Sequence, residues 1–153
     1  WMFGADFLGS DFEHSKLEIL STGYFRLAKS TVLAVRKTLC SVKGDAPFYD
    51  LCMFGRHADL RGYEAGRYRD GATWALQAEL RQRVTDHLGV VGFAGVGGIA
   101  QSSGDIWKHS YVLGSGGVGL RYLASPANDV NLRLDVAWGK DGAAVYFGIG
   151  EAF

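Results

Sequence analysis

Residues 130–138 read Val-Asn-Leu-Arg-Leu-Asp-Val-Ala-Trp, and apolar and polar side chains alternate through this stretch. Successive side chains of a β-strand point to opposite faces, so the pattern predicts a strand with one apolar and one polar face. Residues 74–83 alternate in the same way. Their composition also suits a helix, but helical spacing would scatter their apolar side chains around the axis. Both segments therefore favour an all-β fold.

The same period of two recurs along the rest of the chain. Weaker examples occur at about 1–10, 16–27, 31–42, 88–101, 111–124 and 143–153. The sequence thus predicts about eight strands, several of them longer than the five or six residues of an average strand. Short turns separate them, except for a Gly-rich, charged loop at about 44–71. A loop of that length inside a compact domain usually has a function.

The composition narrows the class of protein. The 153 residues match the length of one domain, so we expect a single domain over residues 1–153. Lys and Arg total 16, and Asp and Glu also total 16. Because a nucleic-acid-binding domain normally has a basic excess, we expect no nucleic-acid partner. The 22 glycines and the 13% of aromatic residues agree with an all-β chain.

Long strands with one apolar face fit two environments. In a soluble β-barrel the apolar side chains would point inward and line a ligand pocket, which gives a soluble binding module as one hypothesis. In a transmembrane barrel they point to lipid, and the polar face lines the lumen. Such a strand needs roughly 9–11 residues to cross the bilayer, and the predicted strands are long enough.

The end of the chain favours the transmembrane barrel. Phe147, Ile149 and Phe153 are predicted to share the apolar face of the last strand, and the sequence stops on the aromatic residue. With Gly150 upstream, this pattern resembles the C-terminal signal of bacterial outer-membrane barrels. Glu151 departs from the pattern, because it would place a charge on the apolar face.

A second resemblance begins in the long loop, which contains Leu60-Arg61-Gly62-Tyr63. This tetrapeptide resembles the Val-Arg-Gly-Phe/Tyr motif of the BamA/TamA surface-antigen superfamily, which inserts or transports proteins at outer membranes. Similar segments follow in the family's order at 66–71, 117–122 and 132–139, and five strands follow the motif loop, as in that family. The resemblance covers roughly residues 16–153.

The resemblance implies a position for the loop. In that family the motif loop folds back into the barrel lumen, and its Arg reaches acidic side chains on the following strands. Here Arg61 would meet Glu79, which the alternation independently assigns to the polar face. The family's second acid lies in a Phe-x-Asp-x-Gly pattern. The matching residues run from Phe93 to Gly97 and have Gly95 in place of the Asp. With one acid fewer to bind Arg61, we expect the loop to be held more weakly in the lumen.

The chain also differs from the family in size. Family members normally have sixteen strands and periplasmic POTRA domains, whereas the sequence predicts about eight strands and no POTRA segment. An open sheet in lipid leaves backbone groups unpaired at its edges. A self-closed eight-stranded barrel has room only for side chains, and the loop would then stay outside. A fragment of a longer barrel is one explanation, but we favour a homo-oligomer that builds a wider barrel.

These expectations together describe an outer-membrane β-barrel protein. The resemblance implies a bacterial outer membrane, or an organelle outer membrane of bacterial descent, with the lipid bilayer and client proteins as partners. The expected role is protein insertion or translocation. The alternatives are a membrane anchor or small pore without a client, and the soluble binding module.

Other candidate chemistry in the sequence is sparse. Residues 114–119 fit Gly-x-Gly-x-x-Gly, but a dinucleotide site needs a following helix, and a strand pattern follows here. Four histidines lack metal-ligand spacing: His14, His57, His87 and His109. No serine lies in a nucleophile elbow. We therefore expect no enzyme activity, no metal and no cofactor.

Cys40 and Cys52 are the only cysteines. In an oxidising compartment they could form a disulfide that tethers the long loop to the preceding strand. Two free thiols are the alternative. No Cys-x-x-Cys pattern suggests metal binding or redox catalysis.

Overall fold

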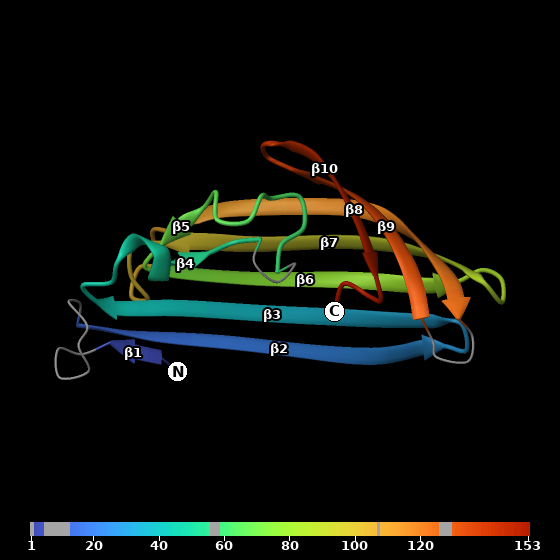
Figure 1. Cartoon of the computed structure of the whole chain (residues 1–153), viewed down its shortest axis with the longest axis horizontal. Coiled ribbons are helices and arrows are strands. Elements are labelled where there is room, and N and C mark those ends of the chain that lie inside the picture. Colours follow the sequence, from blue (N-terminus) through green and yellow to red (C-terminus); the bar gives the residue numbers. More distant parts are fainter. Residues whose placement is uncertain (1, 5–12, 56–58, 107, 126–129) are drawn as a thin grey trace.

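The computed structural model describes residues 2–4, 13–55, 59–106, 108–125 and 130–153. Eight strands form one antiparallel sheet, in which neighbours follow the order of the chain (Figure 1). They are β1 (Met2–Gly4), β2 (His14–Ala28), β3 (Thr31–Gly44), β6 (Ala72–Arg83), β7 (Leu88–Ala100), β8 (Tyr111–Ser125), β9 (Val130–Gly139) and β10 (Gly142–Ile149). The prediction of an all-β antiparallel fold is confirmed.

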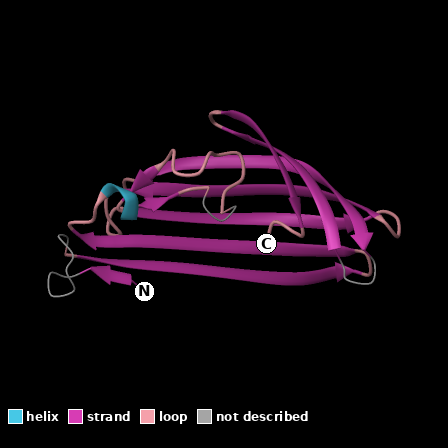
Figure 2. Ribbon diagram, in the orientation of Figure 1, coloured by secondary structure: helices cyan, strands magenta, loops and turns pink. Residues whose placement is uncertain are grey.

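The remaining regular structure lies in the connection between β3 and β6. A short 3₁₀ helix, η2 (Phe48–Asp50), precedes β4 (Cys52–Met53), and β4 pairs with β5 (Arg69–Asp70) as a separate two-stranded sheet. Figure 2 shows that strands make up most of the regular structure. Among the described residues, no helix is both long and apolar enough to cross a membrane.

The predicted strands agree with the observed ones except at the two ends of the chain. Strands β2, β3, β6, β7 and β8 contain 12 to 15 residues each. At about 3.3 Å per residue, even the shortest of them spans roughly 40 Å. Of the predicted strand at 1–10, Met2–Gly4 forms β1, whereas residues 1 and 5–10 lie outside the described residues. The last strand ends at Ile149, four residues earlier than predicted.

The two faces of the sheet differ in polarity. We call the face against which residues 45–55 and 59–71 pack the inner face, and the opposite one the outer face. Large apolar side chains are exposed on the outer face, among them Leu80, Val90, Val118, Leu120, Leu134, Phe147 and Ile149. On the inner face, polar side chains are buried, among them Gln77, Glu79, Arg121 and Asp135. The sheet is therefore apolar outside and polar inside, the reverse of a soluble barrel.

The sheet is open. Among the described residues, β10 pairs only with β9, and no pairing joins it to β1 or β2. Strand β1 covers only the first three residues of β2, so the outer edge of β2 beyond Lys16 lacks a described partner strand. The described residues thus form an eight-stranded sheet that does not close into a barrel.

Glycines on β7 make room for the connection between β3 and β6. A Cβ atom at Gly95 would lie 2.7 Å from Leu60 Cδ1, and one at Gly97 would lie 3.0 Å from the ring of Phe54. The first distance is shorter than real Cβ contacts, and the second is tighter than nearly all of them. Small residues on β7 therefore allow the loop to lie directly on the inner face.

Candidate functional site

The described residues of the long connection between β3 and β6, 45–55 and 59–71, lie on the inner face of the sheet (Figure 1). Pairing of β4 with β5 brings residues 52–53 next to residues 69–70. Phe54, Leu60 and Tyr63 of this loop are buried and pack with Ala75 and Leu113 of the sheet. The sequence prediction that this loop packs against the polar face therefore agrees with the structure.

Gly62 and Tyr63 hold the tip of the loop against β8, β9 and β10. Gly62 has a φ of +102°, which favours glycine, and its N–H donates to Tyr146 Oη at 2.9 Å. Tyr63 Oη donates to the Gly114 carbonyl at 2.7 Å and accepts from Lys140 N at 3.2 Å. A Cβ atom at position 62 would also lie 3.1 Å from backbone atoms of β9. Gly62 and Tyr63 thus both fix the loop tip by hydrogen bonds, and position 62 has little space for a larger residue.

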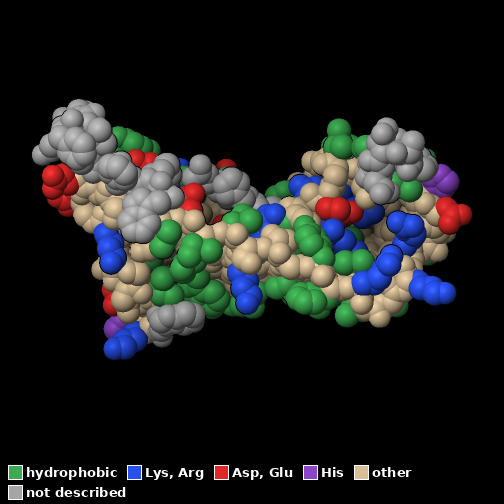
Figure 3. Space-filling model, turned by 90° about the horizontal axis from the view of Figure 1, so that it is seen from below, with side chains coloured by type: hydrophobic (Ala, Val, Ile, Leu, Met, Phe, Trp, Pro, Cys, Tyr) green, Lys and Arg blue, Asp and Glu red, His purple; other side chains and the backbone are tan. Residues whose placement is uncertain are grey.

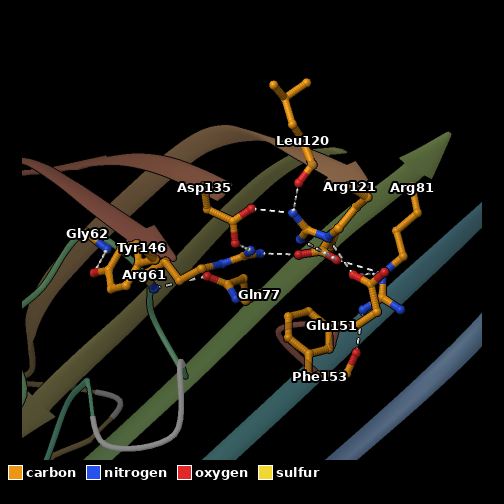
Figure 4. A network of polar contacts seen from close by, with 11 residues as sticks. Arg61, Gly62, Gln77, Arg81, Leu120, Arg121, Asp135, Tyr146, Glu151 and Phe153 are labelled. Carbon is orange, nitrogen blue, oxygen red and sulfur yellow. Dashed lines mark hydrogen bonds and ion pairs between the residues drawn. The ribbon is translucent and has the colours of Figure 1, made fainter. Parts of the chain in front are cut away.

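Arg61 binds two carboxylates from different strands. Its Nη1 donates to Asp135 Oδ2 at 2.8 Å, and its Nη2 donates to Glu79 Oε2 (Figure 4). Its backbone N–H donates to Gln77 Oε1 at 3.1 Å, and its guanidinium lies 3.4 Å from the ring centroid of Phe93. Arg61 is 1% exposed, and both carboxylates are fully buried. Two carboxylates offset the cost of burying this guanidinium.

The sequence pattern and the resemblance predict Glu79 as an ion-pair partner of Arg61. They do not predict Asp135 as its second partner. The second acid comes from β9 and not from β7, where Gly95 makes room for Leu60 instead. Asp135 therefore supplies the second carboxylate that the family's pattern would place at position 95. The alternation of residues 130–138 places Asp135 on the polar face, where it could share one lumen and an ion-pair network with Glu79 and Arg61. The pattern does not pair Asp135 directly with Arg61.

Two further arginines extend the ion-pair network. Arg121 Nη1 donates to Asp135 Oδ1 at 2.5 Å, and Arg81 Nε donates to Glu79 Oε1 at 2.6 Å. Glu151 then accepts from Arg121 Nε at 2.7 Å (Figure 4). Asp135 thus contacts two arginines and Glu79 contacts three, since Arg121 Nη2 also lies 3.8 Å from Glu79 Oε1. These contacts offset the repulsion between neighbouring guanidinium groups.

The last residues of the chain differ from their predicted position. Phe147 and Ile149 face outward, 75% and 74% exposed. Gly150 then adopts a φ of +83°, the chain turns inward, and Phe153 is buried on the inner face. Its ring lies 4.6 Å from the Arg36 guanidinium, and its backbone oxygen accepts a hydrogen bond from Arg81. The turn at Gly150 therefore breaks the alternation on which the prediction for Phe153 depended.

Glu151 is explained by the same turn. A charge at this position does not fit an apolar outer face, but the carboxylate points inward. It accepts hydrogen bonds from Arg121 and, at 3.2 Å, from Asn131 Nδ2.

Neutralising this carboxylate is expected to weaken the fold. Glu151→Gln removes a charged hydrogen bond to the buried Arg121, so we expect the free energy of unfolding to fall by about 1–3 kcal/mol. Urea unfolding of the refolded protein measures this change. Glu64→Gln is the matched control, because Glu64 is exposed in the loop. Equal unfolding midpoints for Glu151→Gln and the unmodified protein would contradict the assignment.

A disulfide joins Cys40 of β3 to Cys52 of β4, with a Cα–Cα distance of 5.7 Å. Cys40 is 8% exposed and Cys52 is fully buried, so water has little access to either sulfur. The bond ties the start of the loop to the strand that precedes it.

The loop also contacts the turn between β9 and β10. Tyr68 Oη donates to Asp141 Oδ2 at 2.7 Å, and Arg67 Nε lies 3.3 Å from the same carboxylate oxygen. The hydrogen bond to Asp141 raises the pKa of Tyr68, because the carboxylate stabilises the protonated phenol. Both contacts are exposed and contribute little to stability.

The other candidate motifs do not assemble into a site. Residues 114–119 lie within β8, so no helix follows them to hold a pyrophosphate. His14 lies near Asp50 and His109 near Asp105, at 3.2 and 3.6 Å, whereas His57 is outside the described residues. Within the described part of the chain, no three His, Cys, Asp or Glu side chains are grouped to hold a metal.

The comparison with protein families agrees with this geometry. The model of the Omp85 superfamily domain matches residues 2–153. No curated protein matches the chain. The resemblance to the BamA/TamA barrel, inferred above from the loop motif and the segments after it, is thereby confirmed. With almost its entire length matched, this chain belongs to the Omp85 superfamily.

Proposed function

We propose that this chain forms part of an outer-membrane β-barrel that inserts or translocates proteins. The Omp85 superfamily is a family of outer-membrane insertion and translocation proteins. The observation that carries the proposal is the position of Arg61, which is buried on the polar inner face between Glu79 and Asp135. Side chains of this kind suit a lumen, and the exposed apolar side chains of the outer face suit lipid.

We further propose that a second copy of the chain closes the barrel. In hydrocarbon, the unpaired backbone groups of β2 and β10 would each cost several kcal/mol. Two copies joined at these edges would leave no edge exposed. They would also enclose a lumen wide enough for both loops, since barrel diameter grows with strand number. The lipid bilayer, a second copy and client proteins are thus the proposed partners.

The alternatives make different demands on the two faces. A soluble binding module requires an apolar interior, and the polar inner face argues against it. A membrane anchor or small pore requires the same apolar outer face as the proposed function. Only an assay with a client protein separates these two roles.

The experiment is reconstitution into liposomes, followed by addition of a radiolabelled, unfolded client barrel. We expect the chain to resist extraction by alkaline carbonate and to increase the protease-protected fraction of the client severalfold over empty liposomes. Arg61→Ala is expected to lose this increase, whereas Arg67→Ala should retain it. Carbonate-resistant protein without any increase supports the anchor, and protein left in the aqueous fraction contradicts membrane insertion.

A further inference from the structure

A group of basic side chains surrounds a cavity at one end of the sheet. This end contains the turns from β2 to β3 and from β6 to β7. A cavity of about 220 Å³ lies there. Its basic lining residues are Arg26, Lys29, Arg81, Arg83 and Arg121, and we call this group the basic mouth. Figure 3 shows Lys and Arg side chains gathered around a hollow at its right-hand end.

Three of these five cations are available to a ligand. Arg81 and Arg121 belong to the ion-pair network. Arg26, Lys29 and Arg83 are exposed, and none of them forms an ion pair with another described residue. Among the described lining residues, the only carboxylates are those of Asp86 and Glu151. The mouth therefore has a local excess of positive charge.

The chain's own residues show what the mouth accepts. The side-chain carboxylate of Glu151 lies in the mouth. It accepts hydrogen bonds from Arg121 Nε at 2.7 Å and from Asn131 Nδ2 at 3.2 Å. Two residues later, the backbone oxygen of Phe153 accepts a hydrogen bond from Arg81. The cavity lies beside this segment, and so do Arg26, Lys29 and Arg83, which form no ion pair within the described part of the chain. The mouth thus already binds one carboxylate-bearing peptide segment, and three of its cations have no ion-pair partner among the described residues.

We propose that the basic mouth binds an extended acidic peptide segment through Arg26, Lys29 and Arg83. A peptide suits this place better than a lipid headgroup, because the mouth opens on the polar inner face and lipid would cover the outer face. The attraction is local, since the whole chain has no net charge. Binding itself does not require translocation. Its use for acidic segments of client proteins rests on the proposed function.

The test measures binding of a hexaglutamate peptide to the protein in non-ionic detergent micelles by isothermal titration calorimetry. The triple variant Arg26→Gln/Lys29→Gln/Arg83→Gln is expected to bind at least about tenfold more weakly, because three ion pairs to the peptide are lost. The matched control, Lys43→Gln/Lys108→Gln/Lys140→Gln, removes the same charge from exposed positions at the opposite end of the sheet. It should keep the affinity within about twofold. Raising the salt concentration should weaken binding to the unmodified protein.

Several outcomes would overturn the proposal. Absence of hexaglutamate binding contradicts it, as does an equal loss in both triple variants, which would show an effect of net charge alone. Stronger competition by inorganic pyrophosphate identifies a phosphate site, and stronger competition by a short-chain phosphatidylglycerol identifies a lipid-headgroup site. Because this assay needs neither liposomes nor a client, its failure is distinguishable from failure of the translocation assay.

Discussion

Replacing Arg61 by alanine is expected to lower the free energy of unfolding by about 3–5 kcal/mol and to release the loop from the inner face. The substitution leaves Glu79 and Asp135 buried with one cation fewer, and removal of one partner from a buried ion pair has a cost of this size. Urea unfolding measures the stability. Limited proteolysis measures the release, because a docked loop resists cleavage and a released one does not.

Two variants make the result specific. Arg67→Ala removes a loop arginine that is 53% exposed and that, among the described residues, forms an ion pair with Asp141 alone. A change below about 1 kcal/mol is therefore expected. Arg61→Lys keeps the charge but has no planar fork to bind two carboxylates at once, so it should recover only part of the stability. Unchanged stability and unchanged protease resistance in Arg61→Ala would show that the ion pairs with Glu79 and Asp135 do not hold the loop.

Loss of the disulfide is the second large effect that we expect. The bond closes a short loop, with a sequence separation of 12 between Cys40 and Cys52, and restricts the unfolded chain. For a loop of this size, the chain-entropy model gives about 3 kcal/mol. Replacing both cysteines by serine should therefore lower the free energy of unfolding by about that amount. It should also expose residues 45–53 to protease, because the start of the loop is no longer tied to β3.

A reductant provides an independent comparison for the same bond. The chain has no other cysteine, so reduction of the unmodified protein should lower its unfolding midpoint toward that of the double serine variant. The double variant itself should not respond to reductant. An unmodified protein whose stability is the same with and without reductant would contradict a structural role for the bond.

The period of two is sufficient to predict most of the sheet. A strand has only two faces, so the alternation alone assigns Glu79 and Asp135 to the polar side. The motif at Leu60–Tyr63 then indicates that the loop lies on that side. Sequence spacing does not give the register between strands that are distant along the chain. For this reason the sequence does not identify Asp135 as the second partner of Arg61.

The alternation does not predict the conformation of the last four residues. Alternation predicts a face only while the strand continues, and a single glycine at positive φ ends it. After Gly150, the contacts of Glu151 with Arg121 and of Phe153 with Arg36 and Arg81 determine the path of the chain. These partners come from three different strands. Contacts between residues so distant along the chain cannot be predicted from a local sequence pattern.

The central claim of this account is that strands from a second copy complete the barrel around the loop that carries Arg61. The most direct test is the protein mass of the refolded chain in detergent micelles, corrected for bound detergent. We predict two chains in each particle, with both sheet edges paired and the loops enclosed. A monomer with a protease-accessible loop would contradict the claim, because a barrel closed from one chain has no room for the loop in its lumen.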